Sequence, residues 1–373
     1  MLYLFVYGSL MSGENASGKL QKCKCLVKFL LEDYAMYDVA NGEFPGIVQK
    51  KGESVIGEIY EIPESLLSDL DAYENEGNLY TRQTVMVKKE NRRLYAIAYI
   101  YNRSIENCRI LRAAYNQKES DCVWYAGYGS NLNTERFLCY VKGGWNPANS
   151  REYSGCKNKS MWLSDCMKTY RGKMYFAKES SSWNGGGVAF YDPLEVGFVF
   201  MRLYKITYGQ LKDIQKQEGP KWYSRMVCLD VMDDDCPVFT LTSENHEREN
   251  QPCENYLKLI RSSLIDLLGN YRTLEIDNYL RGCGGMINND DERNSSIKEV
   301  FKSYKLDGVK IGNTVNIYDP WNYDKPIYTF DLTDNQSIEK CKEEMYKDYK
   351  DRYDFDMFYK RFVKRERVKN IRR

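Results

Sequence analysis

Two apolar runs in this chain break at the same short polar sequence. Leu4-Phe5-Val6 leads into Tyr7-Gly8-Ser9-Leu10, and Trp124-Tyr125-Ala126-Gly127 leads into Tyr128-Gly129-Ser130-Asn131-Leu132. Each pattern predicts an apolar β-strand that ends at a turn. Glycine lets the backbone turn sharply and lets a ligand approach closely. Successive N–H groups in such a loop can cradle a carboxylate or a developing oxyanion.

The first hundred residues alternate between strand and helix patterns. One helix is predicted over Ala16–Lys28, and a second over Pro63–Tyr73, where Leu66, Leu70 and Tyr73 share a stripe. The predicted strands, of which the last two are expected to pair, are Ala35–Val39, Ser54–Glu61, Thr81–Lys88 and Leu94–Tyr101. These patterns predict a small, mostly antiparallel β-domain with helices at its side.

A charged stretch, Arg103–Ser120, is the expected linker and is predicted to be partly helical. The strand pattern then begins again at Val123. Further strands are predicted over Met174–Lys178, Gly187–Phe190 and Phe198–Ile206. Helices are predicted from Asn133 to the Gly143-Gly144 pair, over Tyr208–Gln217 and over Asn255–Leu268.

The two halves share an order of features as well as a loop. In each half a strand ends in an aromatic residue, a helix follows, and a Glu comes at the end of that helix: Glu74 and then Glu218. A Tyr and an Arg follow each Glu, at Tyr80 and Arg82 and at Tyr223 and Arg225. A repeated order of features is the mark of a duplicated unit.

The pattern changes after the polar segment Asn288–Asn294. Two strands, Val309–Tyr318 and Ile327–Phe330, predict a small C-terminal β-hairpin, and a charged, helix-prone tail begins at Gln336. The last 14 residues hold eight Lys or Arg and one Glu. A solvated terminal helix is the expected reading of this tail, which also leaves a nucleic-acid or acidic partner open.

The composition narrows the function classes. Lys and Arg number 54 against 53 Asp and Glu, so no global charge favours nucleic acid or a membrane surface. No apolar stretch of 18 residues occurs, and the N-terminal run has no basic flank, so neither a membrane span nor a signal peptide is expected. The 12 Cys lack metal-site spacing and are expected to be reduced in a cytoplasmic protein. The single His disfavours a Ser-His-Asp triad or a multi-His metal site.

The ordered motifs resemble the γ-glutamylcyclotransferase superfamily, twice in one chain. Residues 1–103 resemble its AIG2-like, γ-glutamylamine cyclotransferase branch, and residues 122–287 look like a second, larger member. Residues 104–121 would link the two, and residues 288–373 would form an extension. The matching residues beyond the loops are Phe44–Val48, Val55–Tyr60, Leu70–Glu74, Tyr80–Arg82, Gly185–Ala189, Gln217–Gly219 and Tyr223. The resemblance implies an α+β fold with two mixed or antiparallel β-barrel domains and flanking helices.

The resemblance also implies a chemistry and its residues. The substrate is a small γ-glutamyl peptide, amino acid or amine, whose own α-amine attacks its γ-carbonyl and releases 5-oxoproline and a free amine. Glu218 and Glu74 fall at the family's catalytic-glutamate positions, as proton acceptor and then donor. No cofactor and no metal are needed. The substrate-binding positions are Tyr7, Gly8, Ser9, Leu10, Tyr80, Tyr128, Gly129, Ser130, Asn131, Leu132 and Tyr223.

Each of these features has a simpler reading. A Glu at the end of a helix is most often a surface charge, and Glu76 competes with Glu74 for the role. Gly185-Gly186-Gly187 can cradle a phosphate, but no Lys-Ser or Lys-Thr follows it, so a structural turn is favoured. The alternative function is a binding or protein-interaction module in which one or both domains have lost the reaction.

Overall fold

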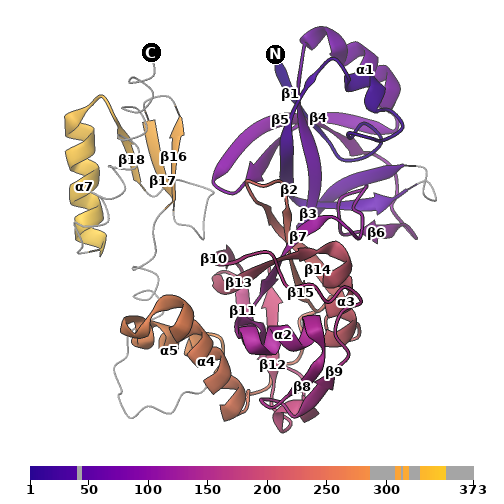
Figure 1. Ribbon diagram of the computed structural model, residues 1–373. Coiled ribbons are helices and arrows are strands. Elements are labelled where there is room, and N and C mark those ends of the chain that lie inside the picture. The colour runs from indigo at the N-terminus through magenta and orange to yellow at the C-terminus, as the bar shows by residue number, and fades with distance from the viewer. Residues whose placement is uncertain (40–43, 286–306, 312–313, 319–327, 350–373) are drawn as a thin grey trace. The chain divides into compact units, whose positions relative to one another are not determined.

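The first feature along the chain is a closed β-barrel (Figure 1). The computed structural model describes residues 1–39, 44–285, 307–311, 314–318 and 328–349. The strands of the barrel are β1 (Leu2–Val6), β2 (Lys24–Asp38), β3 (Pro45–Ile62), β4 (Tyr80–Lys89) and β5 (Arg92–Tyr101). They follow one another in the order β3, β1, β5, β4 and β2, and β2 pairs with β3 to close the ring. All pairs are antiparallel except β1 with β5.

The barrel interior is filled by alternate side chains of its strands. Phe5, Phe29, Leu31, Ile59 and Val87 are buried together in one apolar cluster. The sequence predicted two paired strands for β4 and β5, and they pair over their whole length. A helix, α1 (Leu67–Glu74), follows the short 3₁₀ turn η2 (Glu64–Leu66), as expected.

The predicted helix over Ala16–Lys28 is wrong. Only a 3₁₀ turn, η1 (Ser17–Leu20), forms there, and β2 begins at Lys24. The residues of early β2 pair with β3 and place Phe29 and Leu31 in the barrel core. Burial in a closed sheet therefore outweighs the local helix propensity of this segment.

A second sheet follows, built from β7 (Cys122–Gly127), β10 (Asp165–Arg171), β13 (Phe198–Thr207), β14 (Arg225–Val231) and β15 (Pro237–Thr242). Its order is β10, β13, β7, β15 and β14. Four of these strands repeat the barrel's order β3, β1, β5 and β4, and β7 is parallel to β15 as β1 is to β5. No pairing of β14 with β10 joins the ends among the described residues, so this sheet is open where the sequence predicted a barrel.

Short hairpins and helices surround the second sheet. The hairpins are β8 (Gly144–Asn146) with β9 (Arg151–Tyr153), and β11 (Lys173–Ala177) with β12 (Val188–Asp192). The helices and 3₁₀ turns are η3 (Gly129–Leu132), α2 (Thr134–Lys142), η4 (Ser181–Trp183), α3 (Tyr208–Glu218), α4 (Glu254–Leu268), η5 (Asn270–Arg272) and α5 (Thr273–Gly282). The Asn133 side chain caps α2, and Thr207 with Gln210 forms a capping box at the start of α3.

The expected linker is not helical. Its only regular element is β6 (Arg109–Leu111), which pairs with β2 at the edge of the barrel. Ile110 and Leu111 are half-buried there, and Leu111 packs against the barrel core. The cross-strand hydrogen bonds of β2 therefore decide the conformation of this segment.

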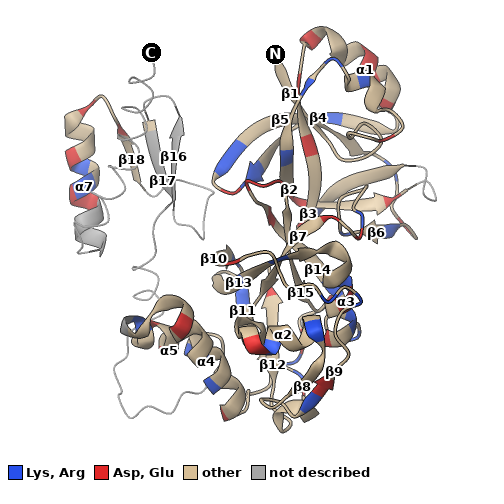
Figure 2. Ribbon diagram, viewed as in Figure 1, with Lys and Arg blue, Asp and Glu red and all other residues tan. Residues whose placement is uncertain are grey.

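The barrel and the second sheet belong to one compact unit, which holds residues 1–276 and 283–287. Leu30 of β2 and Ile56 of β3 are buried in the apolar cluster of the second sheet, beside Val123 and Tyr125. Polar contacts also join the two sheets, because Arg225 Nε lies 3.1 Å from a carboxylate oxygen of Glu53. Acidic and basic residues are interspersed along the elements of this unit (Figure 2).

The second compact unit holds residues 277–282, the end of α5, and residues 288–373, whose described part is a small sheet with one helix. The sheet holds β16 (Asp307–Ile311), β17 (Thr314–Tyr318) and β18 (Tyr328–Asp331), and the helix is α7 (Asn335–Tyr349). The predicted strand Val309–Tyr318 is thus two strands, since Ile311 pairs with Thr314, and the predicted hairpin is a three-stranded sheet. The basic last 14 residues lie outside the described part of the chain.

None of the helices in the described ranges is long and apolar enough to span a membrane.

Candidate active sites

Two cavities open beside the two Gly-Ser loops. The first cavity, about 280 Å³, is lined by Gly8, Ser9 and Leu10 after β1 and by Glu74 at the end of α1. The second cavity, about 390 Å³, is lined by Ser130 and Asn131 after β7 and by Glu218 at the end of α3. In each half the chain thus places a strand-to-loop turn and a helix-terminal carboxylate on the same cavity. These are the groups that the sequence singled out.

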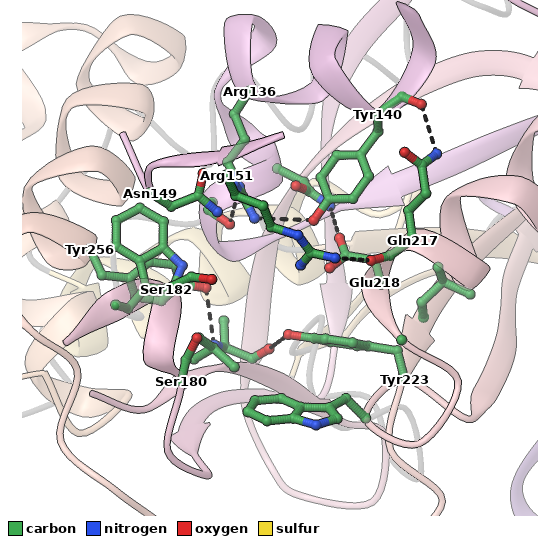
Figure 3. A pocket seen from close by; sticks show the side chains of 18 of the residues that line it. Arg136, Tyr140, Asn149, Arg151, Ser180, Ser182, Gln217, Glu218, Tyr223 and Tyr256 are labelled. Carbon is green, nitrogen blue, oxygen red and sulfur yellow. Dashed lines mark hydrogen bonds between the residues drawn. The ribbon is translucent and has the colours of Figure 1, made fainter. Parts of the chain in front are cut away.

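The Glu218 carboxylate accepts a hydrogen bond from the side-chain amide of Asn131. The amide Nδ2 of Asn131 donates to Glu218 Oε1 at 2.7 Å and to the Tyr125 hydroxyl at 2.8 Å. The Tyr140 ring lines the same cavity, and burial raises the pKa of its phenol well above the usual value. The carboxylate is therefore fixed in orientation with its face to the second cavity (Figure 3).

A buried arginine stands behind this carboxylate. Arg136 is 5% exposed and donates from Nε to Ser130 Oγ at 2.8 Å. Its two other nitrogens donate to the hydroxyls of Tyr153 at 2.8 Å and Tyr140 at 3.1 Å. The guanidinium keeps its charge, and no carboxylate of the described residues lies within ion-pair distance of it. The deep end of the second cavity is therefore positively charged.

Two acceptors at this deep end have no partner. The Oδ1 atoms of Asn131 and Asn149 are buried and accept no hydrogen bond from the described residues. Asn131 Nδ2 faces the acceptor Glu218, which fixes the direction of its amide. A buried polar atom without a partner is costly, so this part of the structure carries two unsatisfied acceptors.

The mouth of the second cavity is exposed and polar. Arg151 and Lys216 lie there with Glu179 and Ser181, and all four are exposed. Trp222 forms an aromatic wall next to them, with Lys178 Nζ 5.3 Å from its ring centre. The cavity is thus buried and cationic at one end and open at the other.

The first cavity differs in charge. Glu74 is the only ionisable acid or base that lines it, apart from tyrosines, and the described chain offers its carboxylate no hydrogen-bond donor. Burial raises the pKa of Glu74 from 4.5 to about 7. The Tyr73 hydroxyl lies 3.0 Å from Ser9 Oγ, so the helix end and the loop touch at the rim. A carboxylate with a pKa near neutrality suits proton transfer.

The predicted tyrosines line the cavities but use their hydroxyls for the backbone. Tyr7 donates to the Tyr99 carbonyl and Tyr128 to that of Leu241, on the corresponding strands β5 and β15. Tyr80 donates to Pro45 O at 2.8 Å, and Tyr223 donates to Ala189 O at 2.9 Å. These rings build cavity walls in equivalent ways in the two halves.

The structure also places the remaining candidates from the sequence, namely two loop residues, Glu76 and the triple-glycine run. Gly129 and Leu132 are buried but do not line the second cavity, and the exposed Glu76 does not line the first. Gly185-Gly186-Gly187 packs against the chain, because a Cβ on Gly187 would lie 2.1 Å from the Asn250 carbonyl oxygen. Gly186 and Gly187 thus lie close to the backbone of Cys253 and Asn250, which agrees with the structural turn that the sequence favoured over a phosphate cradle.

Four residues of the second cavity were not predicted from the sequence: Arg136, Tyr140, Asn149 and Arg151. Arg136 and Tyr140 are four residues apart on the buried face of α2, beside Phe137 and Val141. The sequence feature that could have identified Arg136 is a cation on the apolar face of a predicted helix. Asn149 and Arg151 come from the segment around β9, for which no local pattern predicts a cavity.

Comparisons with known proteins agree with the N-terminal geometry. The family model for gamma-glutamyl cyclotransferase, AIG2-like, matches residues 4–120. The gamma-glutamylcyclotransferase family protein YtfP of Escherichia coli K12 is 30% identical over 110 residues, which are 30% of this chain and 91% of that protein. A putative gamma-glutamylcyclotransferase of Vibrio cholerae is 39% identical over 83 residues, 22% of this chain and 70% of that protein.

Other similar proteins are larger or more distant. Histone deacetylase 5 of Arabidopsis thaliana is 38% identical over 124 residues, and the chain spans only 17% of its length. The structure of YkqA from Bacillus subtilis aligns with 76% of this chain and 98% of its own, at 20% identity and a TM-score of 0.36. A mouse AIG2-like protein aligns with 28% of this chain and 81% of its own, at 24% identity and a TM-score of 0.27.

Proposed function

This chain belongs to the γ-glutamylcyclotransferase family, and from that premise we propose that it releases 5-oxoproline and a free amine from small γ-glutamyl compounds. One observation carries the proposal. A helix-terminal carboxylate faces a Gly-Ser loop across a cavity, once at Glu74 and once at Glu218. Two cavities with the same parts support two sites for the same reaction.

We infer further that the second sheet and its helices are a copy of the family's domain. The repeated strand order supports this, including the parallel pair β7 and β15. The equivalent hydroxyl-to-carbonyl bonds of Tyr7 and Tyr128 support it as well. The copies would span residues 1–103 and 122–287, with a linker over 104–121 and an extension over 288–373.

The reaction needs one proton shuttle in each cavity. The substrate's α-amine nitrogen forms a bond to the γ-carbonyl carbon, and the carbonyl oxygen becomes an oxyanion. The Glu carboxylate takes the proton that the amine loses and then gives it to the leaving nitrogen as the old C–N bond breaks. Atoms and electrons balance without an oxidant or an added group. The attack is intramolecular, so most of the entropic cost is already met by the substrate.

The remaining groups would hold the substrate. In the first cavity the N–H groups of Ser9 and Leu10 donate to no atom of the described chain and would bind the oxyanion or carboxylate. In the second cavity Arg136 would attract the substrate's α-carboxylate to the deep end.

The test is a panel of γ-glutamyl peptides, amino acids and amines incubated with the purified full chain. We expect 5-oxoproline from at least one compound, detected by chromatography and mass spectrometry. A folded sample that yields none from any compound contradicts the proposed activity. Calorimetric binding of panel members without any product would favour the alternative, a binding module that has kept the fold and lost the reaction.

A further inference from the structure

The two cavities differ in the charges at their lining, and this difference bears on the leaving half of the substrate. The first cavity is lined by no Lys or Arg among the described residues. The second has Arg136 at its deep end and Arg151 and Lys216 at its mouth. Its two acids are Glu218, the proposed proton shuttle, and Glu179 at the mouth.

Arg151 lies at the exposed mouth of the second cavity, in contact with the end of α3. Its Nη2 donates to the carbonyl oxygen of Gln217 at 3.2 Å, one residue before Glu218 (Figure 3). Its guanidinium lies 5.0 Å from the centre of the Tyr153 ring, a cation–π distance that limits its freedom. No described carboxylate is within ion-pair distance of it. Arg151 is thus an oriented cation with hydrogen-bond capacity left over.

The position of Arg151 along the cavity, from its buried end to its exposed mouth, determines which half of a substrate would meet this cation. The loop residues Ser130 and Asn131 and the arginine behind them are buried at the deep end, where the glutamyl head would sit. Arg151 and Lys216 are exposed at the mouth, where the departing amine must leave. Lys216 is partly occupied, because its Nζ lies 3.3 Å from a carboxylate oxygen of Asp213. Arg151 is therefore the principal free cation for a group on the leaving amine.

We propose that Arg151, assisted by Lys216, makes the second cavity select γ-glutamyl compounds whose leaving amine carries a carboxylate. The proposal rests on the proposed cyclotransferase function and adds a specificity residue to it. A guanidinium binds a carboxylate through two parallel N–H donors, which an uncharged amine cannot use. The first cavity, without such a cation at its lining, would not make this distinction.

The test compares two substrates that differ only in that carboxylate, γ-glutamyl-alanine and γ-glutamyl-ethylamine. The full chain carries Glu74→Gln so that only the second cavity acts. We expect kcat/KM to favour γ-glutamyl-alanine by about tenfold, the worth of one charged hydrogen-bonding pair. Arg151→Gln should bring the ratio close to one, Arg151→Lys should keep part of it, and Lys142→Gln, an exposed charge outside the cavity, should leave it unchanged.

Salt gives an independent readout. An exposed ion pair is screened at 1 M salt, where the Debye length is about 3 Å, so the ratio should fall toward one. A merely structural role of Arg151 would lower both substrates together and leave the ratio and its salt dependence unchanged. An unchanged ratio in Arg151→Gln, or an equal loss on both substrates, overturns the inference alone. No turnover of either substrate by the unsubstituted chain overturns the proposed function and this inference with it.

Discussion

The side-chain amide of Asn131 donates a 2.7 Å hydrogen bond to the carboxylate of Glu218. This bond ties the loop after β7 to the end of α3 and sets the direction of the carboxylate. In the barrel, Leu10 stands at the corresponding position after Tyr7-Gly8-Ser9 and cannot donate. The same carboxylate position is therefore oriented by a donor in one cavity and surrounded by apolar and aromatic groups in the other.

Glu218→Gln should remove most of the turnover in the second cavity. Glutamine keeps the shape and hydrogen bonding of the side chain but cannot accept the proton, and general acid–base catalysis is worth ~10²–10⁴-fold. Glu74→Gln should act likewise on the first cavity, and neither change should silence the other site. We expect the second cavity to be the more active. The measurement is kcat and KM on the γ-glutamyl panel, with KM little changed.

The double variant Glu74→Gln with Glu218→Gln is the decisive control. Both proposed shuttles are then absent, so the residual rate should be at background. Full activity of this variant would rule out the mechanism, and loss of both activities in either single variant would rule out independent sites.

Asn131→Leu should give the second cavity the apolar neighbour that the first already has. The Glu218 carboxylate would lose its amide donor, and we expect kcat on second-cavity substrates to fall by about tenfold, the worth of one hydrogen bond to a charged group. First-cavity substrates serve as the internal control. A rate equal to that of the parent chain would show that the Asn131 amide is not needed to orient Glu218.

The first cavity should show a pH profile set by Glu74. The carboxylate must be ionised to accept a proton, and burial raises its pKa to about 7. In a Glu218→Gln background, kcat/KM should therefore rise about tenfold per pH unit below pH 7 and level off above it. A profile that is already flat at pH 5.5 would exclude Glu74 as the base.

Because its pKa is raised, Glu74 lowers the free energy of unfolding at high pH. The folded-state pKa lies above the unfolded value, so the unfolded state binds fewer protons between about pH 4.5 and 7 and the free energy of unfolding falls over that window. Glu74→Gln should remove this loss, with a gain at pH 8 of no more than about 3 kcal/mol and none at pH 4. Denaturant titrations at the two pH values would detect it; an equal effect at both would contradict the burial argument.

The contact between Lys89 and Asp235 joins the barrel to the second sheet. The Lys89 side chain is 0% exposed and its Nζ donates to Asp235, which is 43% exposed. Asp235→Asn would remove the hydrogen-bonded counter-charge of a buried ammonium and should lower the free energy of unfolding by ~3 kcal/mol. Asn tolerates the backbone there, where φ is 61°.

Lys89→Met is the matched comparison for this pair. It removes the buried ammonium and leaves only a partly exposed acid, so we expect a change near zero. Equal losses for the two variants, measured by denaturant unfolding, would mean that the pair is better solvated than its burial indicates.

Local patterns were enough to predict most of the elements around the two cavities. Fewer than twenty consecutive residues were enough to predict each of several elements, namely the strands β4, β5 and β13 and the helices α1, α3 and α4. The two loops and the two glutamates could be found as well, because they recur in the same order. Early β2 and the linker were mispredicted because their partners, β3 and β2, lie elsewhere in the chain.

The sequence by itself determined that two strand-to-loop turns and two helix-terminal carboxylates exist, because hydrophobic periodicity and turn chemistry act over a few residues. Only the tertiary structure decided what surrounds each carboxylate. Arg136 meets Tyr153 from 17 positions away, and Asn131 meets Glu218 from 87 positions away. Such contacts depend on the closing of sheets and the packing of α2 and α3 over them, which no local pattern encodes. The same packing left one cavity with arginines and the other without.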